Sequence, residues 1–130
     1  FIMAQQTFFK TVVNMDYENI LERLNAGCDV NQTLGYGRLF EWLLPSENDI
    51  AKQAMNKILT NPAWDPNYRT IDNLSPLERA LVHKRTDIAL KIIAHPKVKP
   101  DVTPRLIQLA KDSSSKKLQS FLKKHMQNQR

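Results

Sequence analysis

The stretch TIDNLSPLERAL, residues 70–81, carries the local signals that decide the fold. Ser75 can cap a helix that begins at Pro76, where a proline loses no backbone hydrogen bond that the helix needs. Glu78 stands three residues after the serine, which is the spacing of a capping box. Apolar residues follow, and Asn73 before them tolerates positive φ better than most residues. The stretch therefore predicts a turn that leads directly into a helix.

Helical signals recur along the whole chain. Apolar residues three and four apart, with prolines, a glycine and capping residues at their ends, predict eight short helices in four pairs. The expected helices cover residues 8–15, 17–27, 38–45, 46–62, 75–83, 86–96, 103–111 and 113–127, with Ser46 as the cap of the fourth. Strand signals are poor, because no segment alternates cleanly between apolar and polar residues. We therefore expect an all-α fold.

The expected helix pairs also repeat at a regular interval. Adjacent apolar residues in the second helix of each pair begin at residues 20, 58, 92 and 121, which are 38, 34 and 29 residues apart. Short tails rich in Asp, Asn and Pro follow three of these helices, at residues 28–31, 64–67 and 98–101. A stacked array of helix pairs produces such a period.

At these residues the chain resembles the ankyrin repeat family. Asp65 and Asn67 are similar to the D-x-N of its repeat, Asp72-Asn73 to its finger turn, and SPLERA (75–80) to its T-P-L-H-x-A. The resemblance implies an ankyrin-like solenoid of about four stacked helix pairs joined by finger-like turns, with the terminal pairs acting as caps. The units would be 4–31, 32–67, 68–101 and 102–127 of a single domain, 1–130. A tetratricopeptide array has a similar period but lacks the D-x-N tails and the finger.

The chain departs from the family pattern at two places. Glu78 replaces the family's histidine, which breaks the usual side-chain hydrogen bond to a neighbouring loop. Lys84-Arg85 replaces the glycine between the paired helices, which predicts a looser or differently shaped turn.

Composition limits the class of protein. The chain has 130 residues, of which 42% are hydrophobic and 25% charged, as in an ordinary globular domain. Cys28 is its only cysteine, which favours a reducing compartment and hence the cytoplasm. No apolar run reaches the roughly 18–20 residues of a membrane helix. The chain begins at Phe1 rather than methionine, so we interpret it as a fragment of a longer protein whose other parts could include a catalytic domain.

Charge is unevenly distributed along the chain. Residues 1–65 hold five Lys and Arg against eight Asp and Glu, a net charge of −3. Residues 66–130 hold fourteen against five, a net charge of +9. The basic C-terminal half suggests one alternative function, electrostatic binding of nucleic acid or of an acidic surface. The start of the sequence without methionine suggests another, that the chain is the accessory domain of a larger enzyme.

Signals for catalysis are lacking in the sequence. His83, His95 and His125 are scattered, Cys28 has no histidine near it, and neither zinc spacing nor a glycine-rich phosphate loop occurs. We therefore expect no enzyme activity, no cofactor and no bound metal.

The leading hypothesis is a protein-interaction module. In ankyrin-like arrays the finger tips and the first helices line a concave binding surface, and Tyr, Trp and Arg are enriched at binding hot spots. The residues expected to contact a partner protein are Tyr36, Arg38, Trp42, Tyr68, Arg69, Ile71, Leu74, Arg79 and His83. The histidine-proline ending at 95–96 resembles repeats of intracellular bacteria and their secreted effectors, which implies a host-cell protein as partner. We expect a monomer.

Overall fold

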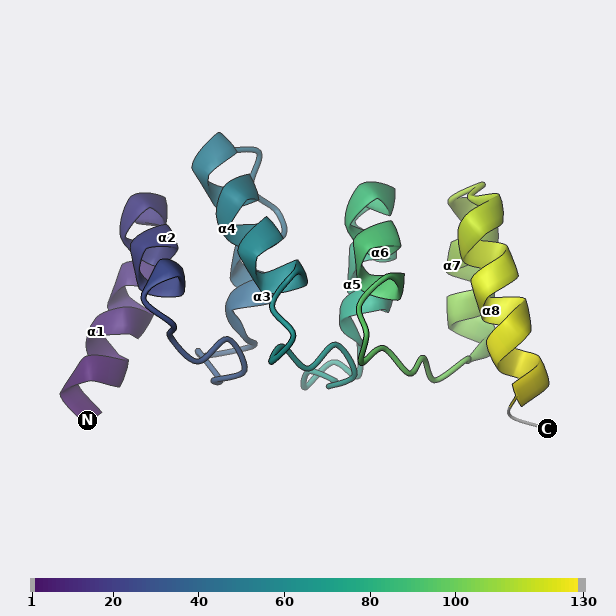
Figure 1. Cartoon of the computed structure of the whole chain (residues 1–130), viewed down its shortest axis with the longest axis horizontal. Coiled ribbons are helices and arrows are strands. Elements are labelled where there is room, and N and C mark those ends of the chain that lie inside the picture. The colour runs from purple at the N-terminus through teal and green to yellow at the C-terminus, as the bar shows by residue number, and fades with distance from the viewer. Residues whose placement is uncertain (1, 129–130) are drawn as a thin grey trace. The chain divides into compact units, whose positions relative to one another are not determined.

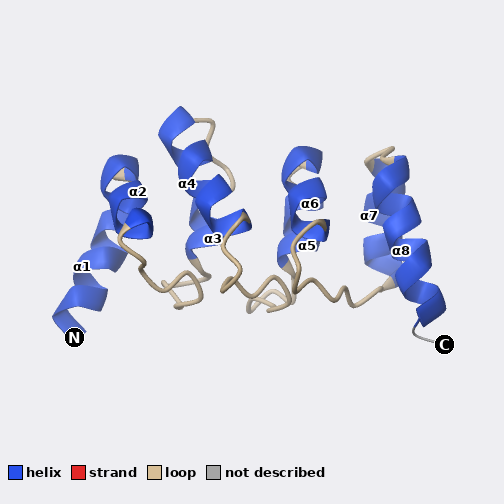
Figure 2. Ribbon diagram, in the orientation of Figure 1, coloured by secondary structure: helices blue, strands red, loops and turns tan. Residues whose placement is uncertain are grey.

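The computed structural model describes the backbone of residues 2–128 and the side chains of residues 8–126. The described part of the chain forms eight helices and no strand, joined by loops and turns, and Figures 1 and 2 show their order. The helices are α1 (Ile2–Val13), α2 (Tyr17–Asn25), α3 (Leu39–Leu43), α4 (Asp49–Leu59), α5 (Pro76–Val82), α6 (Thr86–Ile93), α7 (Pro104–Asp112) and α8 (Lys116–Asn128). The all-α prediction is confirmed, and one isolated bridge pairs Leu34 with Gly37.

Side chains at the helix starts explain most boundaries. Ser75 accepts a hydrogen bond from the backbone N–H of Glu78, as predicted, and Thr103 caps α7 in the same way through Leu106. The predicted cap Ser46 is wrong, because the Asn48 side chain accepts the bonds at the start of α4. The hydroxyl of Ser46 accepts a bond from the Asn48 N–H instead, which orders the loop before the helix.

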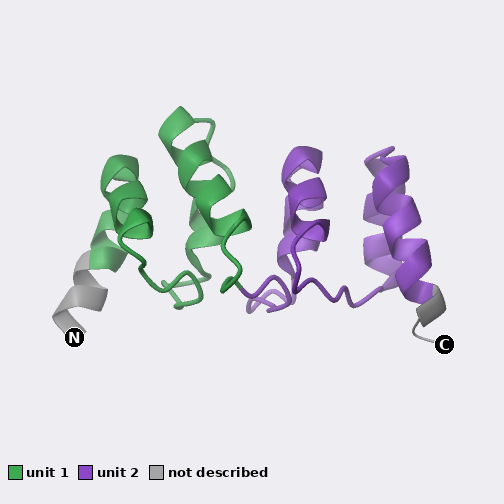
Figure 3. Cartoon of the chain, viewed as in Figure 1, with its two compact units in different colours: residues 1–64 green, residues 65–130 purple. Residues whose placement is uncertain are grey.

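The chain separates into two compact units, residues 1–64 and 65–130, which Figure 3 shows in green and purple. In unit 1, α2 packs on α4, α1 contacts both α2 and α3, and α3 contacts α4. In unit 2, α5 packs on α6 and α7, and α8 contacts α6 and α7. Large apolar side chains form each core, with Phe40, Ile58 and Trp64 buried in unit 1 and Ile92 and Leu118 in unit 2.

Three of the helix pairs turn through a residue of the same conformation. Met15, Lys84 and Ser114 each have positive φ, at 57°, 59° and 59°. Each donates its backbone N–H to the carbonyl three residues earlier, at 3.0 Å. Lys84 therefore supplies the left-handed conformation for which glycine is the usual residue.

The tails after α2 and α4 also make equivalent bonds. Asn31 donates from Nδ2 to the carbonyl oxygen of Ala63, within unit 1, at 2.8 Å. Asn67 donates in the same way to Lys97, within unit 2, at 2.8 Å. Each asparagine thus ties its own tail to the tail that follows the next second helix, about one repeat period further along the chain.

Candidate binding surface: the finger turns and the first helices

The finger turn of unit 2, residues 70–74, is a closed backbone turn. The N–H of Asn73 donates to the carbonyl of Thr70 at 2.8 Å, and the N–H of Thr70 donates to the carbonyl of Leu74 at 3.2 Å. Asn73 has a φ of 62°, the conformation that the sequence led us to expect. The turn therefore has a defined shape and ends at the cap of α5.

Arg79 of α5 stabilises this turn through hydrogen bonds to Thr70 and Asp72. Its Nη2 lies 2.6 Å and 2.8 Å from the two carboxylate oxygens of Asp72, and 2.7 Å from the hydroxyl oxygen of Thr70. The Thr70 hydroxyl donates a short hydrogen bond to Asp72. These bonds from Thr70 and from Arg79 lower the pKa of Asp72 below its ordinary value. We call Thr70, Asp72 and Arg79 the finger clip.

The clip presents one large apolar side chain to solvent. Ile71 is 95% exposed at the tip of the turn, whereas Leu74 is only 7% exposed and packs inward. Of these two expected contact residues, only Ile71 offers its whole side chain to a partner.

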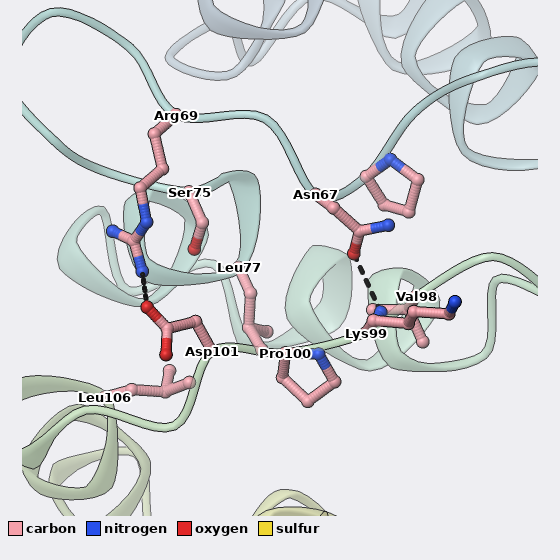
Figure 4. Close-up of a pocket in the computed structure, with 10 residues that line it drawn as sticks. Asn67, Arg69, Ser75, Leu77, Val98, Lys99, Pro100, Asp101 and Leu106 are labelled. Carbon is pink, nitrogen blue, oxygen red and sulfur yellow. Dashed lines mark hydrogen bonds and ion pairs between the residues drawn. The ribbon is translucent and has the colours of Figure 1, made fainter.

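Arg69 holds the base of the same turn. Its Nη1 donates to the carbonyl oxygen of Asn73 and pairs with Glu78, at 2.8 Å in both cases. Its Nη2 lies 3.3 Å from Asp101 in the next tail, as Figure 4 shows. Glu78 is 2% exposed, and its carboxylate also accepts from the Ser75 hydroxyl.

The Glu78 contacts correct one prediction. The carboxylate does not close a capping box, because Arg69 and the Ser75 hydroxyl are its partners rather than the Ser75 N–H. The carboxylate instead forms an ion pair with Arg69, at the base of the finger of the same repeat.

The hollow beside Arg69 in Figure 4 is too small for a substrate. It measures about 40 Å³ and lies between the tails of unit 2, where Asn67 accepts from the N–H of Lys99. Ligand pockets usually measure about 300–1,000 Å³. The hollow reflects the packing of the two tails and not a catalytic cleft.

In unit 1, an aromatic cluster occupies the loop before α3. Tyr36 is 51% exposed, and its ring centroid lies 4.8 Å from that of Trp42. Trp42 donates from its indole nitrogen to the carbonyl of Leu34 at 2.5 Å, which fixes the ring against the loop. Phe9 of α1 meets the Trp42 ring edge-on at 6.0 Å. Tyr36, Trp42 and Phe9 together form what we call the aromatic cluster.

Two glycines permit this arrangement. Gly35 has a φ of 70°, and a Cβ there would lie 3.0 Å from Phe9 and 3.3 Å from Trp42. At Gly37, a Cβ would lie 2.9 Å from Glu41, whose buried carboxylate accepts from the Arg38 N–H. The loop can therefore pass close to the rings and to α3.

The remaining expected contact residues lie in less prominent positions. Arg38 is half-buried and donates to Asn31, and Tyr68 is half-buried as well. His83 is exposed at the end of α5. Whether any of the nine residues contacts a partner stays a prediction. Phe9 was missed, although the adjacent pair Phe8-Phe9 signalled that one ring would lie outside the core.

Two observations concern metal-ligating and nucleophilic side chains in the described part of the chain. No group of three or more His, Cys, Asp or Glu side chains among residues 8–126 could hold a metal ion. Burial, and next the charge of Asp29, raises the pKa of the Cys28 thiol, which disfavours the nucleophilic thiolate. None of the described helices is both long and apolar enough to cross a membrane.

Comparison of the chain with protein-family models, with curated proteins and with solved structures finds no match.

Proposed function

We propose that this chain is a protein-interaction module made of ankyrin-like helix pairs, and that it binds a partner protein through its finger turns and first helices. The recurring left-handed turns at Met15, Lys84 and Ser114 support the repeat interpretation. So do the matching side-chain bonds of Asn31 and Asn67.

The observation that carries the proposal is Ile71 on the fastened finger turn. A solvent-exposed isoleucine contributes nothing to the core, and burying it against a partner would gain about 1.5–3 kcal/mol. The finger clip holds the turn before binding, so little conformational entropy is lost on association. A rigid, exposed apolar tip is the arrangement expected of a binding anchor.

The aromatic cluster of unit 1 provides a second contact region. Tyr and Trp bury large areas with few rotatable bonds, and the Tyr36 hydroxyl donates to the carbonyl oxygen of Glu41 at 3.3 Å, which orients the exposed ring. We assign Arg69 and Arg79 to the support of the finger rather than to direct contact, because their guanidinium groups are already paired within unit 2.

Cys28 as the only cysteine supports a cytoplasmic location. In this proposal the chain performs no catalysis and needs no cofactor.

The test uses the chain as bait in extracts of the cells in which it acts. We expect Ile71→Asp in unit 2 and Tyr36→Ala in unit 1 each to reduce capture of the partner at least about tenfold, as loss of a hot spot does. Val82→Asp is the matched control, because Val82 is also an exposed apolar residue of unit 2 but lies at the far end of α5.

Circular dichroism should show unchanged helix content in all three variants. Full capture of the partner by both the Ile71 and Tyr36 variants would overturn the proposal. Equal loss in the Val82 variant would point to nonspecific charge repulsion and overturn it as well.

A further inference from the structure

Another hollow of unit 2 lies on the pair formed by α7 and α8. It measures about 150 Å³, and it is lined by Ile107, Ala110 and Lys111 of α7 and by Gln119, Leu122, Lys123 and Met126 of α8. A cavity of about 150 Å³ can accept a benzene-sized group. The hollow therefore has room for one large apolar side chain.

The floor of the hollow is apolar and partly open to solvent. Ala110 and Leu122 are buried beneath it, Ile107 is half-buried, and Met126 is 38% exposed at its edge. Methionine adapts its shape to an incoming group, because its side chain is unbranched and polarizable. An apolar anchor would find a deformable wall there.

Positively charged side chains lie at both edges of the hollow. Lys111 projects from α7 and Lys123 from α8, and both are exposed. Around them, residues 104–126 hold Arg105, Lys116, Lys117 and Lys124 as well, against the single acid Asp112. Among the described side chains, the ion pairs of the structure include none of these cations.

We propose that this hollow binds an acidic amphipathic helix of a partner protein, with a Leu or Phe anchor in the hollow and carboxylates beside Lys111 and Lys123. Helices commonly dock in this way, by placing an apolar face in a groove between helices and charges along its rim. The surface is separate from the finger turn, so this proposal does not depend on the proposed function.

The observations favour a protein helix over the two other anionic partners. Proteins bind single-stranded nucleic acid through aromatic side chains that stack on its bases, and no aromatic side chain lines this hollow. A membrane surface is bound by apolar side chains that protrude into lipid, whereas here the apolar groups lie in a depression.

The test measures binding of a fluorescent synthetic helical peptide by anisotropy, with the full chain at physiological salt. The peptide carries Leu and Phe on one face and Glu elsewhere. One control peptide replaces Glu with Lys, and a second replaces Leu and Phe with Ser. We expect the acidic amphipathic peptide to bind and each control peptide to bind at least about tenfold more weakly.

Variants of the chain locate the site. Lys111→Glu and Lys123→Glu should each weaken binding about tenfold, because each replaces an attraction with a repulsion. Met126→Asp should weaken it similarly, and circular dichroism should report an unchanged fold. Lys124→Glu is the matched control, since Lys124 is the exposed neighbour of Lys123 on α8 but does not line the hollow. It should change binding less than about twofold, because Lys124 lies outside the hollow and salt screens a charge that does not contact the bound peptide.

Several outcomes would overturn the proposal. Equal weakening by Lys124→Glu, or equal binding of the Ser peptide, would show diffuse charge attraction. Absence of binding at millimolar peptide would refute it directly. Tighter binding of phosphatidylserine vesicles or of single-stranded DNA through Lys111 and Lys123 would assign the surface to another class of partner. A dimer in sedimentation equilibrium that Met126→Asp dissociates would assign it to a second copy of the chain.

Discussion

Asn67 hydrogen-bonds to the backbone of Lys97 and of Lys99 through the two polar atoms of its side-chain amide. Its Nδ2 donates to the carbonyl oxygen of Lys97 at 2.8 Å, and its Oδ1 accepts from the N–H of Lys99 at 2.7 Å. One side chain thus satisfies two backbone groups of a tail that has no regular secondary structure. In both tails, the asparagine of the D-x-N pattern donates to the carbonyl of the tail one repeat further on.

Removing this amide should destabilise unit 2. We expect Asn67→Ala to lower the free energy of unfolding by about 1–2 kcal/mol, because two hydrogen bonds are lost. Asn31→Ala should cost about 1 kcal/mol in unit 1 for the same reason. Urea denaturation followed by circular dichroism measures both. Asn25→Ala, at the exposed end of α2, is the control and should change stability by less than about 0.5 kcal/mol.

Replacing Lys84 with glycine should stabilise the chain. Lys84 has positive φ in the turn between α5 and α6, where a side chain costs about 1–2 kcal/mol relative to the right-handed conformation. After the entropy cost of glycine, we expect Lys84→Gly to raise the free energy of unfolding by about 0.5–1 kcal/mol. Gln119→Gly, inside α8, should instead lower it by about 1 kcal/mol. Thermal melts measure both variants. A shift of the melting temperature in the same direction for Lys84→Gly and Gln119→Gly would contradict the left-handed conformation of Lys84.

The side chains of His95 and Asn61 play the same role, because each accepts a hydrogen bond from the backbone N–H two residues later. The N–H of Lys97 donates to Nδ1 of His95, and the N–H of Ala63 donates to Oδ1 of Asn61. We expect His95→Ala to cost about 1–3 kcal/mol, because it removes the acceptor of a partly buried N–H. His95→Asn should recover about half of that loss or more. Denaturant midpoints compare the variants, and an asparagine variant no better than alanine would refute the equivalence of the two positions.

The finger clip should weaken in acid. The pKa of Asp72 in the folded chain lies below its ordinary value of 3.8, so the ionised carboxylate stabilises the folded state at higher pH. That contribution is lost as the pH falls below 3.8 through the folded pKa. We therefore expect Asp72→Asn to be less stable than the wild type near neutral pH, and the difference between them to shrink as the pH falls below 3.8. Asp112→Asn, whose carboxylate accepts from neutral Gln108, serves as the comparison.

The sequence allowed the helix pairs to be predicted because their signals are local. Ser75 stands next to Pro76, and both act within one helical turn. Local signals failed where two capping residues competed. Ser46 and Asn48 lie two positions apart, and only the path of the loop decides that Asn48 bonds to α4.

The candidate surface was harder to predict because its bonds join distant residues. Arginine is a residue type that is common at hot spots, which is why Arg69 and Arg79 were expected to contact a partner. However, Arg69 bonds to Asp101, which lies 32 positions away in the sequence. Whether an arginine supports a turn or faces a partner depends on such distances. Ile71 and Leu74 are both apolar residues of one turn, and the left-handed backbone at Asn73 separates them into an outer and an inner side chain.

The position of Ile71 also affects how this chain can change over time. Folding of the turn depends on Thr70, Asp72, Asn73 and Arg79, and the side chain at 71 touches none of the core. Residue 71 can therefore be exchanged for almost any other without loss of the scaffold. A new binding preference could arise there by a single mutation, which makes the turn a natural place to build diversity by design or by selection.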